Sequence, residues 1–157
     1  MHCLSLKEAI CKMNKNQDHN SPVNPVQPIG NINTLTQRVI ACAFAVHHAL
    51  GPGFLEKVYE NSLRIELEET GLSVIQQHPI PVLYRSRIVG DFCADLMVDG
   101  RIIIEVKAVQ HFAKEHEVQL VNYLTATGID DGLLINFGSS VEVKRKFRNF
   151  KRPDLQG

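Results

Sequence analysis

Residues 91–107 read Asp91-Phe-Cys-Ala-Asp-Leu-Met-Val-Asp-Gly-Arg-Ile-Ile-Ile-Glu-Val-Lys107, and they contain two strand patterns joined by a turn signal. Residues 91–98 alternate in polarity, as a half-buried strand does. Residues 102–106 are a β-branched apolar run, which is typical of a buried strand. Asp99-Gly100 between the two is a strong hairpin signal. The stretch therefore predicts an antiparallel hairpin within a sheet.

The length of the hairpin loop determines whether Asp95 and Glu105 face the same way. A two-residue loop would place Asp95 opposite Ile104, and the two carboxylates would point to opposite faces of the sheet. A three-residue loop, with Gly100 in the left-handed conformation, shifts the register by one residue. Both carboxylates then lie on the face of Ile103, as diagonal neighbours within reach of one ion. We expect the longer loop.

Glu105 and Lys107 alternate with Val106 at the end of the apolar strand, so their side chains project to one face. Burying either charge unpaired is costly, so the two either pair with each other or share a site. Carboxylate oxygens of Asp95 and Glu105, with the main-chain carbonyl of Val106, form an oxygen-only donor set suited to Mg²⁺ or Mn²⁺. Such an ion acidifies water and holds a phosphate oxygen. Lys107 would then orient that water or stabilise charge in the transition state.

The rest of the pattern predicts an α/β domain. Apolar residues recur at helical spacing from Thr34, the expected N-cap, to Leu50, and again from Phe54 to a C-cap at Gly71. A further helix is expected at 113–127, and further strands at 72–77, 81–85, 133–137 and 141–144. Together these elements predict a mixed β-sheet flanked by helices.

Composition favours one soluble domain with ends of a different character. Of the 157 residues, 44% are hydrophobic and 22% charged, and 17 basic residues balance 17 acidic ones, so net charge names no partner. Residues 1–33 are rich in Asn, Gln and Pro without an apolar period, so we expect a disordered N-terminal extension. The domain is expected over residues 34–147, followed by a basic tail over 148–157, because residues 144–152 contain no acid.

The chain shows no sign of export or membrane insertion. Its four cysteines are scattered, without a CxxC pair or a cystine-framework spacing. No apolar run is long enough to cross a membrane, and no continuous apolar segment marks a signal peptide. These features predict a cytoplasmic protein.

Three motifs resemble those of known families. Asp95…Glu105-Val106-Lys107 resembles the D…(D/E)xK signature of the PD-(D/E)XK nuclease superfamily, whose restriction-endonuclease-like core is a mixed sheet flanked by helices. Gly53-Phe-Leu-Glu-Lys-Val-Tyr59 matches the G-x-x-E-x-x-Y string that names the GxxExxY protein family. Gln119 and Tyr123 match the Q-x-x-x-Y motif of RecB-like members. The motifs occur in the expected order, with Ala94 where the superfamily name has proline.

The resemblance implies a Mg²⁺- or Mn²⁺-dependent nuclease acting on DNA or RNA. Asp95 and Glu105 would bind the metal, and Glu56 would be a further acidic residue reaching it from a helix. Gln119 and Tyr123, on one helical face, would contact the nucleic-acid backbone or support the lysine. The alternative is a non-catalytic module that keeps the fold and binds nucleic acid or a protein. A third interpretation is a purely structural ion-pair network without metal.

Several of these residues also have simpler explanations. Glu56 lies in a glutamate-rich stretch and equally fits a solvated helix residue, and Tyr123 fits an amphipathic core position. His47 could line the site as a base near the metal ligands, and His116 could face the same cleft from one turn before Gln119. Neither His47 with His48 nor His111 with His116 has the i, i+4 spacing of a metal-binding pair on a helix. The basic tail is a solvated terminus or, beside a nuclease fold, a phosphate contact.

Overall fold

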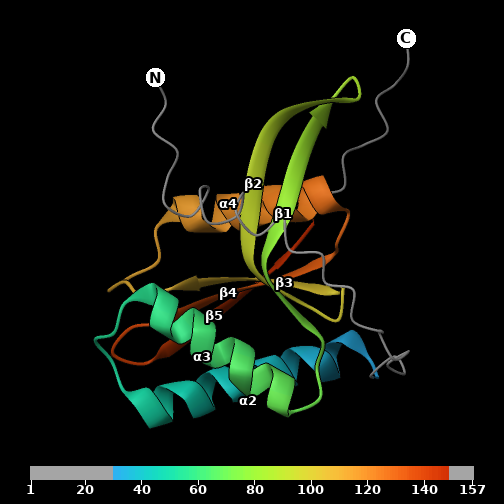
Figure 1. The fold of residues 1–157 in the computed structure, drawn as a ribbon. Coiled ribbons are helices and arrows are strands. Elements are labelled where there is room, and N and C mark those ends of the chain that lie inside the picture. The colour runs from blue at the N-terminus through green and yellow to red at the C-terminus, as the bar shows by residue number, and fades with distance from the viewer. Residues whose placement is uncertain (1–29, 149–157) are drawn as a thin grey trace.

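The computed structural model describes residues 30–148, which form a five-stranded mixed sheet with helices on both faces (Figure 1). The strands follow the order β1-β2-β3-β4-β5; β3 and β4 are parallel, and the other neighbours are antiparallel. This arrangement confirms the predicted α/β fold. The elements are α2 (Ile32–Leu50), α3 (Glu56–Glu69), β1 (Val74–Tyr84), β2 (Arg87–Val98), β3 (Ile102–Lys107), α4 (Lys114–Thr127), β4 (Asp131–Phe137) and β5 (Val141–Phe147).

The sheet separates two apolar layers. Helices α2 and α3 cover one face, where they pack against Ile102, Ile104 and Val106 of β3. Helix α4 covers the other face, where Ile103 packs against Leu120. Alternate residues of β3 therefore belong to different layers, which is why its sequence reads as a continuous apolar run.

Strands β1 and β2 form a hairpin that is longer than the sequence predicted. Its outer half, residues 81–92, extends past α4 and is called the arm below (Figure 1). The expected separate strands at 72–77 and 81–85 are one strand, which contains Pro79 and Pro81. That prediction was wrong because β1 is an edge strand, where proline is tolerated at positions whose N–H would point away from the neighbour.

The helix boundaries also differ from the predicted ones. Helix α2 begins at Ile32, two residues before Thr34, because the side chain of Asn31 caps it by accepting a hydrogen bond from Asn33 N at 3.0 Å. Helix α3 begins at Glu56 rather than at Phe54. Most of the expected extension (1–29) and most of the expected basic tail (149–157) lie outside the described residues. None of the helices between residues 30 and 148 is both long and apolar enough to span a membrane.

Candidate metal centre

The loop between β2 and β3 has three residues, as expected. Val98 pairs with Ile102, and both Asp99 (φ 51°) and Gly100 (φ 64°) are left-handed. Continuing the register beyond the pair of Leu96 and Ile104 places Asp95 directly opposite Glu105. The diagonal arrangement expected from the sequence is therefore wrong, and the two carboxylates are closer neighbours than it implied.

The two strands stop pairing through their main chains where the carboxylates begin. The Asp95 N–H donates to Glu105 Oε1 at 3.2 Å, and the Val106 N–H donates to Asp95 Oδ2 at 2.8 Å. Each carboxylate thus takes the place of a main-chain acceptor on the facing strand. Asp95 is 1% exposed and Glu105 is 0% exposed, so packing and these bonds hold both side chains in one conformation.

Strand β2 is irregular on its other side as well. Gln76 pairs with Leu96 and His78 pairs with Ala94, but Gln77 between them has φ 54° and leaves the ladder at the level of Asp95. Ala94 packs on the α4 side and Leu96 on the α2–α3 side, although residues two apart in a strand normally share a face. Asp95 therefore lies where both neighbouring pairings are broken, and such distortions cluster at functional sites.

A buried glutamate stabilises the distorted segment. Glu60 Oε1 accepts hydrogen bonds from Gln77 Nε2 at 2.7 Å, from Gln76 Nε2 at 2.8 Å and from Lys57 Nζ at 2.8 Å. Glu60, which belongs to the same glutamate-rich stretch as Glu56, is buried. These charge-assisted bonds connect α3 to the strand beside Asp95.

Lys107 lies at the more accessible end of the centre. Its side chain is 13% exposed, and its Nζ is 3.9 Å from Glu105 Oε2. His116, near the start of α4, is close enough for the charge of Lys107 to act on it. Burial, and then that positive charge, hold the pKa of His116 below its usual value. Its Nδ1 accepts a hydrogen bond from Ala113 N at 3.2 Å, so the ring also caps the helix.

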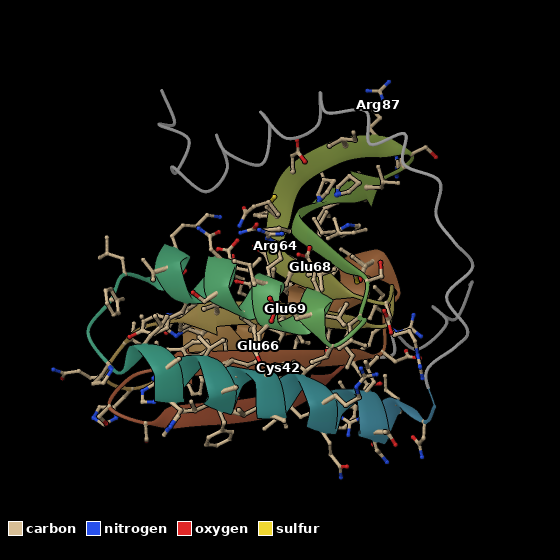
Figure 2. All side chains as sticks on the ribbon, turned by 60° about the horizontal axis from the view of Figure 1, so that its bottom comes forward. Cys42, Arg64, Glu66, Glu68, Glu69 and Arg87 are labelled. Carbon is tan, nitrogen blue, oxygen red and sulfur yellow. The ribbon has the colours of Figure 1, made fainter. Side chains whose placement is uncertain are left out.

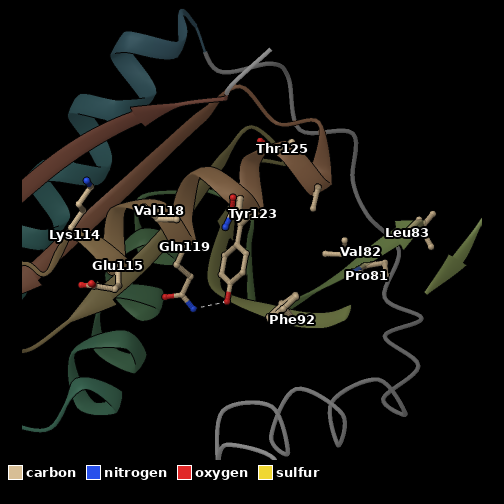
Figure 3. Close-up of a pocket in the computed structure, with 12 residues that line it drawn as sticks. Pro81, Val82, Leu83, Phe92, Lys114, Glu115, Val118, Gln119, Tyr123 and Thr125 are labelled. Carbon is tan, nitrogen blue, oxygen red and sulfur yellow. Dashed lines mark hydrogen bonds between the residues drawn. The ribbon is translucent and has the colours of Figure 1, made fainter. Parts of the chain in front are cut away.

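Gln119 and Tyr123 lie together on α4, and the Gln119 Nε2 donates to the Tyr123 hydroxyl at 2.7 Å (Figure 3). Tyr123 is buried, as its alternative interpretation as a core residue predicted. Both residues line a groove of about 820 Å³ between α4 and the arm. Asp95, Glu105 and Lys107 are not among the residues that line this groove.

Glu56 and His47 are placed differently from the central pair. Glu56 is the first residue of α3. Within residues 30–148, no three His, Cys, Asp or Glu side chains gather as a possible set of metal ligands, so Glu56 does not join Asp95 and Glu105 in such a set. His47 Nε2 lies 2.9 Å from the carbonyl oxygen of Gly138, and this hydrogen bond ties α2 to the loop after β4.

Two further residues shape the surroundings: Asn136, which the sequence analysis did not single out, and Tyr59, the tyrosine of the G-x-x-E-x-x-Y string. Asn136, buried in β4 beside Lys107, accepts a hydrogen bond from Val109 N at 2.9 Å and donates to Val109 O at 2.8 Å. Tyr59 donates its hydroxyl to Gly51 O at 2.7 Å. A polar residue inside the apolar run 133–137 was the available signal for Asn136.

The donor set fits a hard divalent cation. Two carboxylates and a main-chain carbonyl supply only oxygen ligands, and Mg²⁺ is commonly held by one or two carboxylates together with water and substrate phosphate oxygens. Two neighbouring buried carboxylates repel each other when ionised, and a cation between them relieves that cost.

A family model described as the PD-(D/E)XK nuclease superfamily matches residues 33–149. No curated protein matches the sequence. Among solved structures, that of SSO0001 is similar with a TM-score of 0.47 and 15% identity; the match covers 76% of this chain and 60% of that one. An alkaline exonuclease (LHK-Exo) from Laribacter hongkongensis has a TM-score of 0.41 and 16% identity, over 76% of this chain and 83% of that one. The chain thus spans 60% of the length of the first of these proteins.

Proposed function

Because this chain belongs to the PD-(D/E)XK nuclease superfamily, we propose that it is a metal-dependent nuclease that hydrolyses phosphodiester bonds in DNA or RNA. One observation carries the proposal. Asp95 and Glu105 face each other where β2 and β3 separate, each fixed by a main-chain N–H of the other strand, with Lys107 beside them.

Asp95, Glu105 and the carbonyl of Val106 would hold Mg²⁺ or Mn²⁺, since members of the superfamily generally use divalent metals such as Mg²⁺. When bound, the ion supplies Lewis acidity for a water molecule and for the scissile phosphate. The fixed carboxylates would hold such an ion beside Lys107. Lys107 Nζ would stabilise the negative charge that grows on the phosphate oxygens.

The remaining predicted residues take supporting roles in this proposal. Glu56 would assist the metal site from the start of α3 without completing a three-carboxylate set. Gln119 and Tyr123 would act as the Q-x-x-x-Y pair and contact the nucleic-acid backbone, and residues 53–59 would mark membership of the GxxExxY family. His116 is near Lys107 and stays neutral at neutral pH, because its pKa is lowered. His47 has a structural role through Gly138.

The alternative, a non-catalytic nucleic-acid- or protein-binding module, is favoured by one observation. Asp95 and Glu105 are nearly inaccessible, and main-chain N–H groups already donate to both. Two carboxylates whose only role is to hold a distorted hairpin together would show the same burial and the same hydrogen bonds. The two functions differ in whether a metal binds and whether a phosphodiester is cut.

Cleavage of end-labelled single- and double-stranded DNA and RNA, with Mn²⁺, Mg²⁺ or EDTA, tests the proposal. We expect metal-dependent cleavage by the wild type and its loss in Glu105→Gln and Lys107→Met. Lys146→Met is the matched control, because it removes an ion-paired lysine from β5 at the edge of the sheet. Cleavage that persists in Glu105→Gln would show that a contaminant or another site is responsible. Metal binding without cleavage would favour the binding module.

A further inference from the structure

The arm presents apolar side chains to solvent along its outer half. Leu83 is 62% exposed, Tyr84 62%, Ile88 67% and Val89 63%. These residues are adjacent, because Leu83 pairs with Ile88 and Tyr84 pairs with Arg87 across the hairpin. Exposed apolar side chains gathered in one segment mark a binding site more often than scattered ones do.

The tip of the arm is basic. Residues 85 and 86 are both left-handed, with φ 46° and 63°, so the turn is tight and presents Arg85 and Arg87 on its two sides. The Arg85 guanidinium lies 5.4 Å from the centre of the Tyr84 ring. Figure 2 shows Arg87 at the end of the arm, far from the labelled residues of α2 and α3.

The groove of about 820 Å³ lies at the base of the arm (Figure 3). Phe92, 40% exposed, lines it and lies 6.0 Å from the Tyr123 ring, centre to centre. Gly90 makes this placement possible, because a Cβ there would come within 2.7 Å of the Phe92 ring. On the α4 side, the groove is lined by one positive side chain, one negative side chain and two amides: Lys114, Glu115, Gln119 and Asn122.

We propose that the arm and this groove bind a single strand of nucleic acid and lead it to the carboxylates. Bases would stack on Tyr84 and Phe92, while Arg85, Arg87 and Lys114 would neutralise phosphates. This combination of exposed rings and interleaved basic groups is how proteins bind single strands without reading sequence. The inference rests on the proposed function, whose substrate it narrows.

The charge pattern favours nucleic acid over a protein partner. The tip presents two arginines next to an exposed ring, and guanidinium groups both stack on bases and pair with phosphates. The acids nearby are Asp91 on the arm and Glu115 in the groove. A duplex fits less well, because its bases are stacked inside and offer no faces to the two rings.

The route to the carboxylates is short. Phe92 and Asp95 are three residues apart on β2, which is roughly 10 Å along a strand. About three nucleotides, at roughly 3.4 Å per stacked base, would span that distance. One single strand of nucleic acid could therefore contact both the arm and the metal centre.

Fluorescence anisotropy of the full chain with a labelled 20-mer, in EDTA so that nothing is cut, tests the inference. The probes are oligo(dT), oligo(U) and a mixed-sequence duplex of the same length. We expect Tyr84→Ala to weaken single-strand binding about tenfold, because one base–ring stack is lost. Arg87→Ala should reduce the slope of the logarithm of the association constant against the logarithm of the salt concentration by about 0.7. That is the change expected when one phosphate contact to a single strand is lost.

Matched controls exist on the opposite edge of the sheet and on α3. Phe147 on β5 is exposed and has Arg145 5.0 Å from its ring centre, like the pair on the arm, so Phe147→Ala should leave binding unchanged. Arg64→Ala removes a positive charge from α3 and should not alter the salt slope. Circular dichroism of each variant checks that the fold is intact.

Three results would overturn the inference. The first is single-strand binding by Tyr84→Ala and Arg87→Ala that is as tight as that of the wild type, and the second is tighter binding of the duplex than of either single strand. The third is a change in the self-association of the arm variants, measured by sedimentation, without any effect on oligonucleotide binding. Binding in EDTA is measured separately from cleavage, so either proposal can fail while the other stands.

Discussion

Replacing Asn136 by aspartate should destabilise the fold at neutral pH, because Asn136 uses both atoms of its amide to hold Val109. The side-chain oxygen accepts from Val109 N at 2.9 Å, and the side-chain nitrogen donates to Val109 O at 2.8 Å. Aspartate keeps the first bond but replaces the donor with an oxygen that faces the carbonyl. The loop that follows Lys107 would lose half of its attachment to β4.

The expected size follows from the groups involved. One lost hydrogen bond contributes about 1 kcal/mol, and leaving the Val109 carbonyl without its donor adds about 1–2 kcal/mol, since Val109 is half-buried. The sum, about 2–3 kcal/mol, corresponds to a decrease of roughly 10 °C in Tm for a domain of this size.

The loss should depend on pH. A buried carboxyl that faces a carbonyl is favoured in its protonated form, so the pKa of the introduced carboxyl should be higher in the folded than in the unfolded state. The penalty should therefore be small below the unfolded pKa of about 4 and should grow as pH rises through the folded pKa.

Thermal melts of Asn136→Asp from pH 4 to pH 8 measure this dependence. Asn122→Asp, at an exposed position on α4, is the matched control and should melt like the wild type. A variant whose Tm equals that of the wild type at pH 8, or whose deficit grows towards pH 4, would refute the reasoning.

Three further changes test other parts of the structure. Tyr59→Phe keeps the buried ring but removes the hydroxyl that donates to Gly51 O, and should cost about 1–2 kcal/mol in urea unfolding; an unchanged midpoint would count against that bond. Hydrogen bonds from two lysines of β5 lower the pKa of Glu117 to about 2, so Glu117→Gln should be less stable than wild type at pH 7. That difference should close as pH falls from 4.5 towards 2, and a gap that persists at pH 2 would contradict the assignment. Glu56→Gln should reduce the Mn²⁺-induced rise in Tm by less than Glu105→Gln does, and an equal loss would make Glu56 a direct ligand.

The sequence predicted the central hairpin because its geometry is local. Asp99-Gly100 gives a left-handed turn, and the register it sets brings Asp95 and Glu105 to the same place without any long-range information. The layers followed from apolar periodicity, which the burial of the helices and of β3 confirms. Those patterns depend on neighbours within a few residues, so they can be read from one chain.

The irregularities around Asp95 could not be predicted in the same way. Regular alternation was assumed for β2, yet Ala94 and Leu96 lie on opposite faces and Gln77 leaves the ladder. On the β3 side, main-chain N–H groups donate to carboxylates of the facing strand instead of to main-chain carbonyls, which is a tertiary effect. The burial of Glu60 is likewise a tertiary effect, because its partner Gln77 is distant in sequence.

The length of the hairpin was underestimated because its outer part follows no burial pattern. Residues 87–89 are all exposed, so β2 continues there without the apolar–polar alternation that marks a half-buried strand. Pro79 and Pro81 also suggested an interruption that an edge strand does not need. The predicted architecture therefore lacked the arm, although it included the strand that carries Asp95.

The most direct test of the metal centre is a thermal melt of wild type and Glu105→Gln with Mn²⁺, Mg²⁺ or EDTA. Glutamine keeps the shape of the side chain and an oxygen for the Asp95 N–H, so the variant should fold. Glu69→Gln, on the exposed side of α3, controls for the loss of one negative charge.

A metal at one hundred times its Kd stabilises the folded state by about 2.7 kcal/mol. We predict that Mn²⁺ raises the Tm of wild type and Glu69→Gln by roughly 10 °C and leaves Glu105→Gln unchanged. A wild-type Tm that stays the same at millimolar Mn²⁺ and Mg²⁺ would contradict the metal centre and leave the carboxylates a structural role.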